Sequence, residues 1–168
     1  VRLVLNPFFI ESDEQFDLAD VNSGAVCRRV TAFEDKVSCR TQVLKSVKDG
    51  QIKLEPLRLV NVLKDLVYDQ DSFLFDKYQE VKPWIETSGL EPKDEYLIPN
   101  ETIQDLRKVM ECTMCGLCDE GCTVLVVDKT FLGPAALTKA YRVVKDPRDT
   151  EIQKRLNDLS AKRGMWDC

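Results

Sequence analysis

Residues 112–122, CTMCGLCDEGC, contain four of the seven cysteines of a 168-residue chain. Cys112, Cys115, Cys118 and Cys122 follow the spacing C-x2-C-x2-C-x3-C. A structural zinc usually takes two thiolates from one C-x2-C pair and two from a distant segment, whereas an iron–sulfur cluster can take three from one tight loop. The run therefore favours an iron–sulfur cluster. Zinc, or thiols that bind no metal, are the alternatives.

The first three cysteines of the run are predicted to hold one cubane cluster. Cys122 is predicted to ligate a second cluster, as the fourth cysteine of such runs typically does. Gly116 and Gly121 either let the backbone approach the sulfides closely or make the loop flexible. Cys168, the last residue, is either a frayed thiol or the start of another cysteine run. Because a cluster needs more ligands than Cys122 and Cys168 supply, the count indicates an incomplete sequence or ligands from another chain.

The composition narrows the chemistry. The chain has no histidine, which excludes Ser-His-Asp and Cys-His catalysis, His-ligated zinc and a Rieske centre. Lys and Arg number 24 and Asp and Glu 29, for a net charge of −5, which argues against a general nucleic-acid binder. No apolar run approaches the roughly 18 residues of a membrane span, and VRLVLNPFFI at residues 1–10 does not resemble a signal peptide. Clustered cysteines favour a reducing compartment.

The first part of the chain is predicted to be rich in strands. VRLVLN at residues 1–6 alternates weakly, and residues 27–44 predict a hairpin around residues 34–36. That hairpin would bring Cys27 towards Cys39. Asp49-Gly50 predicts a turn before a further strand. Residues 57–69 suit either a short helix or a strand end followed by a loop.

The last third is predicted to be helical. The aromatic residues of 73–84 are expected to pack on a neighbouring element, and residues 86–100 form a linker rich in Pro, Gly and charge. Asn100 is predicted to cap a first helix, Pro134 to begin a second, and Thr150 to cap a third that ends before Gly164. The apolar stripes of these helices are expected to form a core.

Several stretches around the cysteine run closely resemble the iron–sulfur subunit of succinate dehydrogenase and fumarate reductase. They are CTMCGLCDEGCTV, FLGPAALTKAYRVVKDPRDT and GMWDC, preceded by RTQVLK, GQIKLEPLRLVNVLKDLVYD and KYQEVKPWI. The resemblance covers roughly residues 24–168. The CGLC wording and the spacing from Cys122 to LGPAA are closer to the fumarate reductase branch, although Thr123 replaces the usual Pro and VLVVDK a tryptophan-bearing segment.

The resemblance implies an α+β chain with two domains. Residues 1–85 would be an incomplete β-grasp domain of the plant-type ferredoxin kind, which carries [2Fe–2S] in the family. After the linker at 86–100, residues 101–168 would be a truncated, all-α domain like bacterial ferredoxin. In the family this second domain holds [4Fe–4S] together with [3Fe–4S] or a second [4Fe–4S].

Residue by residue, the resemblance implies that Cys112, Cys115 and Cys118 bind the [4Fe–4S] cluster. Cys122 and Cys168 would bind the cluster nearest the quinone.

Cys27 and Cys39 match the third and fourth ligand positions of the [2Fe–2S] loop pattern, C-x4-C-x2-C…C. The first two positions fall on Ala19 and Gly24, which cannot bind iron, and the part before Cys27 is too short for a complete β-grasp. Either segments are missing from the chain or the subunit has lost this site.

The family also implies partners. The subunit would carry electrons between an FAD-containing flavoprotein and a membrane anchor that binds quinone, with no substrate site of its own. It would be peripheral on the cytoplasmic face of the cell membrane or the matrix face of the mitochondrial inner membrane. Two rivals remain: the iron–sulfur subunit of a heterodisulfide or thiol-linked fumarate reductase, and a structural subunit that has lost clusters.

Overall fold

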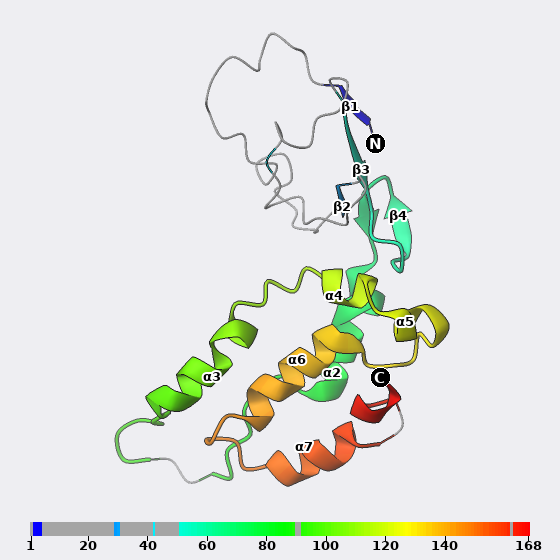
Figure 1. Cartoon of the computed structure of the whole chain (residues 1–168). Helices are drawn as coiled ribbons and strands as arrows, with labels where there is room; N and C mark the ends of the chain where they lie inside the picture. Colours follow the sequence, from blue (N-terminus) through cyan, green and yellow to red (C-terminus); the bar gives the residue numbers. More distant parts are fainter. Residues whose placement is uncertain (1, 5–28, 31–41, 43–50, 90–91, 162) are drawn as a thin grey trace, which may run out of the picture. The chain divides into compact units, whose positions relative to one another are not determined.

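The computed structural model describes residues 2–4, 29–30, 42, 51–89, 92–161 and 163–168. The chain divides into two compact units, Val1–Gln70 and Asp71–Cys168. In the described residues the first unit contains antiparallel strands and the second contains helices (Figure 1). The predicted α+β class is therefore confirmed, while the assignment of ferredoxin-like domains to 1–85 and 101–168 stays a prediction.

A three-stranded antiparallel sheet organises the first unit. Strand β3 (Gln51–Glu55) lies between β1 (Arg2–Val4) and β2 (Arg29–Val30). Leu3 pairs with Ile52, and Val30 pairs with Leu54. These strands confirm extended structure at three predicted places.

Other predictions for this unit fall outside the described residues. They are the turns at 34–36 and 49–50, and the positions of Cys27 and Cys39. The [2Fe–2S] assignment consequently stays a prediction.

Residues 62–68 form a hairpin, so the helix considered for this segment is wrong. Strand β4 (Val62–Lys64) pairs antiparallel with β5 (Val67–Tyr68), and Asp65 turns the chain with a φ of 53°. Leu66 and Tyr68 are buried while Val67 between them is half exposed, which is the two-residue alternation of a strand. Branched valines also suit the pleated surface better than a helix.

The second unit is built around one central helix. Helix α6 (Gly133–Val144) contacts α2 (Asp76–Val81), α3 (Asn100–Met110), α4 (Leu117–Glu120) and α7 (Ile152–Leu159), as Figure 1 shows. Three alanines of α6 are almost fully buried, and such small side chains allow neighbouring helices to approach closely. The core also contains Leu74, Leu106, Phe131, Leu132 and Val143.

Shorter elements complete this unit. A π-helical turn, η4 (Asp71–Phe75), runs directly into α2. Helix α5 (Thr123–Val127) follows the cysteine run, and a 3-10 turn, η5 (Met165–Asp167), ends just before Cys168. No helix in the described part of the chain is long and apolar enough to cross a bilayer.

The three long helices match their predicted places, but two of the predicted caps are wrong. Pro134 lies in the first turn of α6, as expected. Asn100 is already helical, Pro99 precedes it as the N-cap residue, and no side chain caps α3. Thr150 does not cap α7, whose N-cap residue is Glu151. Its hydroxyl instead donates to the Glu86 carbonyl at 2.9 Å, a partner distant in sequence.

The aromatic residues before the linker divide into two groups. Phe73 and Tyr78 are buried, which confirms that they pack in the core. The rings of Phe75 and Tyr78 meet edge to face, with centroids 6.0 Å apart and planes at 74°. Trp84 differs from the prediction: it is 45% exposed, and its indole nitrogen donates to Glu86 at 2.7 Å.

Arg155 fastens α7 to the segment that follows α2. Its Nε and Nη2 lie 3.2 and 2.9 Å from the two carboxylate oxygens of Asp149, in a buried ion pair. The same guanidinium donates to the carbonyls of Lys82 and Trp84, both at 2.7 Å. Asp149 also accepts the Glu86 N–H at 3.0 Å. The segment at 82–86 is thus held to the bundle well before α3 begins.

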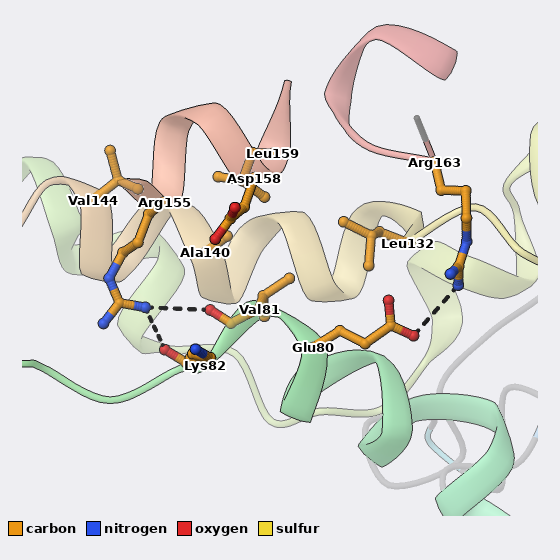
Figure 2. Close-up of a pocket in the computed structure, with 10 residues that line it drawn as sticks. All are labelled: Glu80, Val81, Lys82, Leu132, Ala140, Val144, Arg155, Asp158, Leu159 and Arg163. Carbon is orange, nitrogen blue, oxygen red and sulfur yellow. Dashed lines mark hydrogen bonds and ion pairs between the residues drawn. The ribbon is translucent and has the colours of Figure 1, made fainter. Parts of the chain in front are cut away.

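A cavity of about 190 Å³ lies beside Arg155 (Figure 2). Figure 2 shows its two arginines already engaged: Arg155 with the carbonyls of Val81 and Lys82, and Arg163 with Glu80 at 3.3 Å. Ala140 and Leu159 contribute apolar lining. The arginines here serve as connections within the bundle.

Candidate metal centre

The cysteine run forms an irregular loop between α3 and two short helices. The Cys112 N–H donates to the Val109 carbonyl at 3.4 Å as α3 ends. Met114 and Gly116 both have positive φ, 58° and 73°. The Gly116 carbonyl then accepts the Glu120 N–H at 3.0 Å and so begins α4. The loop needs a left-handed residue at Gly116, which glycine adopts without strain.

The two glycines of the run do not have the same role. Gly121 has an ordinary φ of −80°, and an added Cβ would meet only backbone atoms at 3.7 Å or more. Neither its conformation nor the space around it requires glycine. Of the two, only Gly116 has a backbone reason to be glycine.

Three of the cysteines are near enough to one buried hydroxyl for their charges to affect its pKa. The pKa of Tyr78 is raised, first by burial and then by the negative charges of neighbouring groups. Those groups are Cys112, Asp119, Cys118 and Cys115. The hydroxyl is buried and has no hydrogen-bond partner among the described residues. The three cysteines of the C-x2-C-x2-C run therefore all lie within electrostatic range of the same hydroxyl, and their role as ligands stays a prediction.

The local environment opposes ionisation of a bare Cys118 thiol. Although part of the side chain is exposed, the surrounding protein raises the pKa of this thiol to about 11, and the charge of Asp119 adds to the effect. The charges of Cys115 and Cys112 raise it further. Thiolates bind metals, so the positive charge of bound iron would have to stabilise this group of anions.

Cys122 lies near a different side chain. Burial lowers the pKa of Lys77, while the negative charges of Asp119 and then Cys122 oppose that shift. Lys77 and Tyr78 are consecutive residues of α2, so α2 provides the lysine near Cys122 and the tyrosine near the other three cysteines. Cys168 is exposed at the end of η5.

A single ion and a cluster place different requirements on the donor set. Among the described residues, no three Cys, Asp or Glu side chains converge closely enough to hold one metal ion. A cubane sets a different requirement, because each thiolate binds its own iron atom at a separate corner. The Tyr78 hydroxyl, which has no hydrogen-bond partner among the described residues, could donate to a sulfur of such a cluster.

Asp119 is a site residue that the sequence did not reveal. Its side chain is fully buried, and Oδ1 accepts the Ala135 N–H at 2.8 Å in the first turn of α6. Oδ1 also lies 3.9 Å from the Cys118 sulfur. Burial raises the pKa of the carboxyl. A charge inside a cysteine run suggests a solvated loop, and the pairing with a helix sixteen residues later has no local signal.

Gly133 allows this close approach. Its φ is +84°, and an added Cβ would lie 2.9 Å from Cδ1 of Leu125 and 3.0 Å from Oδ1 of Asp119. The LGPAA stretch therefore has a physical role, because a larger residue would push Asp119 away from α6.

Comparison with known proteins identifies relatives of one kind. The fumarate reductase iron–sulfur subunit of Mycobacterium tuberculosis (strain CDC 1551 / Oshkosh) is 33% identical over 137 residues, 80% of this chain and 55% of that protein. The protein of the same name from Haemophilus influenzae is 30% identical over 154 residues, 84% of this chain and 59% of that one. No protein-family model matches the chain.

A solved structure shares the fold. A chain of the Mycobacterium smegmatis Sdh1 complex in the apo form aligns with a TM-score of 0.64 and 21% identity, over 80% of this chain and 56% of the other. This chain spans little more than half the length of the relatives it matches. The resemblance seen in the sequence is confirmed: the chain is similar to fumarate reductase iron–sulfur subunits and shares the fold of the Sdh1 complex chain.

Proposed function

We propose that the chain is the electron-transfer part of a succinate dehydrogenase or fumarate reductase. It would carry electrons between a flavoprotein subunit, where the dicarboxylate reacts, and membrane quinone. The observation that carries the proposal is the C-x2-C-x2-C run. The charges of its three cysteines all contribute to the raised pKa of the same buried Tyr78 hydroxyl. The names of the relatives support the same function.

In this proposal Cys112, Cys115 and Cys118 bind a [4Fe–4S] cluster. Cys122 and Cys168 contribute to a second cluster, either [3Fe–4S] or [4Fe–4S]. The spacing supports this assignment, because the fourth cysteine of such a run typically ligates another cluster.

The cysteines of the first unit complete the ligand proposal. Cys27 and Cys39 would supply part of a [2Fe–2S] site. Their support is the match to the third and fourth ligand positions of the plant-type ferredoxin pattern.

A bound cluster would supply one-electron transfer, and the protein would hold and tune it. The three thiols are the ligands, and the left-handed Gly116 allows the tight loop that presents them. Asp119 anchors the loop to α6 through the Ala135 N–H. Asp119, which is fully buried beside Cys118, is the nearest charged group that could tune the reduction potential of such a cluster.

The proposed partners follow from the same function. An FAD-containing flavoprotein would lie on one side and a quinone-binding membrane anchor on the other. The chain would be peripheral on the cytoplasmic face of the cell membrane or on the matrix face of the mitochondrial inner membrane.

Cys115→Ala in the assembled complex tests the proposal. The variant should lose the [4Fe–4S] signal in electron paramagnetic resonance and the associated iron and sulfide. Turnover linked to quinone should cease, while dye-linked oxidation at the flavoprotein persists. Thr113→Ala, an exposed change in the same loop, is the control and should alter none of these.

Two results would contradict the proposal. Quinone-linked turnover that survives in Cys115→Ala would show that this residue is not a required ligand. Iron near zero in the anaerobically purified, unaltered complex would favour the rival structural subunit without clusters.

A further inference from the structure

The Tyr78 hydroxyl is a buried hydrogen-bond donor with no acceptor among the described residues. The side chain is 4% exposed, and its oxygen has no hydrogen-bond partner in the described part of the chain. Burying a hydroxyl without a partner is unfavourable, whereas phenylalanine would fill the same space without that cost. Packing alone thus explains the ring of Tyr78 and leaves its oxygen unexplained.

The position of the ring is fixed by its surroundings. Tyr78 lies in α2, which packs against the central helix α6. The neighbouring Phe75 ring meets it edge to face at 6.0 Å. Because the ring is held by these contacts, the Tyr78 hydroxyl keeps one orientation.

That place is beside the cysteine loop. The charges of Cys112, Cys118 and Cys115 all act on the hydroxyl. Its other charged neighbour, Asp119, accepts the Ala135 N–H through Oδ1, while its Oδ2 has no hydrogen-bond partner among the described residues. The tyrosine and this oxygen therefore do not bond to each other, and the donor remains available to the loop.

We propose that the Tyr78 hydroxyl donates a hydrogen bond to a sulfur of the cluster held by Cys112, Cys115 and Cys118, and thereby raises its reduction potential. This inference rests on the function proposed above. Reduction adds negative charge to the cluster, and a hydrogen bond to sulfur stabilises the more negative state. Tyr78 itself exchanges no electron; it is a positioning residue.

Tyr78→Phe tests the inference directly, because it removes one oxygen and keeps the ring. In the assembled complex, a redox titration followed by electron paramagnetic resonance should show easier oxidation of the [4Fe–4S] cluster. We expect the equilibrium constant for reduction to fall about three- to tenfold, where tenfold is 59 mV for one electron. The potential of the other cluster, near Cys122, should not change.

A matched control and a variant of opposite sign sharpen the test. Tyr141→Phe makes the same chemical change at a tyrosine of α6 that is 43% exposed, and it should leave the potential unaltered. Site-specific 3-fluorotyrosine at position 78 strengthens the donor and should raise the potential. It also retains the hydroxyl, so the inference stays testable if the phenylalanine variant assembles poorly.

Unfolding gives a readout that is independent of redox chemistry. Without iron, Tyr78→Phe should be at least as stable as the unaltered protein, because the removed hydroxyl had no partner. With the cluster loaded, the same change should lower the melting temperature. A purely structural tyrosine would shift both forms in the same direction.

The possible results distinguish a failure of the Tyr78 hydrogen bond from a failure of the proposed electron-transfer function. Loaded variants whose potentials equal that of the unaltered complex would overturn the role of Tyr78 and leave the cluster assignment intact. An unaltered complex without a [4Fe–4S] cluster would overturn the proposed function and this inference with it.

Discussion

Gly133 shows how one residue sets the spacing between the cysteine loop and α6. It combines a left-handed backbone with contacts that leave no room for a Cβ. Gly89 has a similar φ of +77°, but in the described part of the chain no atom beyond its direct neighbours lies within 4 Å of an added Cβ. The two glycines therefore separate backbone strain from steric crowding.

Gly133→Ala is expected to destabilise the protein more than Gly89→Ala. Each change costs about 1–2 kcal/mol for the left-handed backbone. Only Gly133→Ala adds about 1–3 kcal/mol for overpacking against Leu125 and Asp119. Urea unfolding of the two variants measures the difference, and equal losses would contradict the crowding.

Arg155 provides a second prediction at the residue scale. Arg155→Met should cost about 3–5 kcal/mol, because it leaves Asp149 charged and buried without its partner. Lys154→Met removes a neighbouring cation whose 3.2 Å pair with Glu151 is exposed, and should cost less than about 1 kcal/mol. Thermal unfolding measures both, and similar losses would show that burial does not matter here.

At the scale of elements, the turn between α6 and α7 gives the fold a dependence on acid. Hydrogen bonds from Arg148 lower the pKa of Asp146, chiefly through its side chain at 2.8 and 2.6 Å. For Asp149 burial alone would raise the pKa, but hydrogen bonds from Arg155 and from backbone N–H groups outweigh it and lower the pKa. Both carboxyls therefore bind protons more readily in the unfolded chain.

Asp146→Asn should flatten this dependence. Because the folded pKa lies below the ordinary 3.8, the stabilisation is complete above pH 5 and is lost as the pH falls through the folded pKa. The variant should be about 1–3 kcal/mol less stable at pH 7, and the two proteins should converge as the pH falls below the folded pKa of Asp146. Urea unfolding from pH 7 to pH 2 tests this. Asp105→Asn, an exposed change on α3, should leave the curve unaltered, and parallel curves for Asp146→Asn would contradict the argument.

Local sequence predicted some elements better than others. The 3.6-residue periodicity of α3, α6 and α7 predicted their places, because each buries one continuous face. The hairpin at 62–68 was harder to predict, because a short apolar run does not show whether its period is that of a strand or of a helix. The caps failed for another reason: the Thr150 hydroxyl bonds to Glu86, and no local pattern contains that pair.

At the scale of the whole chain, the cysteine spacing predicted candidate ligands, which stay a prediction, and it gave no information on their surroundings. The charges of Cys112, Cys115 and Cys118 contribute to the raised pKa of Tyr78. The charge of Cys122 opposes the lowering of the Lys77 pKa. The spacing contained no information on either α2 residue, because they precede the run by more than thirty positions. These interactions between α2 and the cysteine run form only in the folded chain, where both α2 and α4 pack against α6.

The hydrogen bond from Ala135 to Asp119 links the thiols to the opening motions of the fold. Movement of the loop away from the bundle would leave the first turn of α6 without this acceptor and disturb the helix that four others contact. Loop and bundle are thus expected to open together.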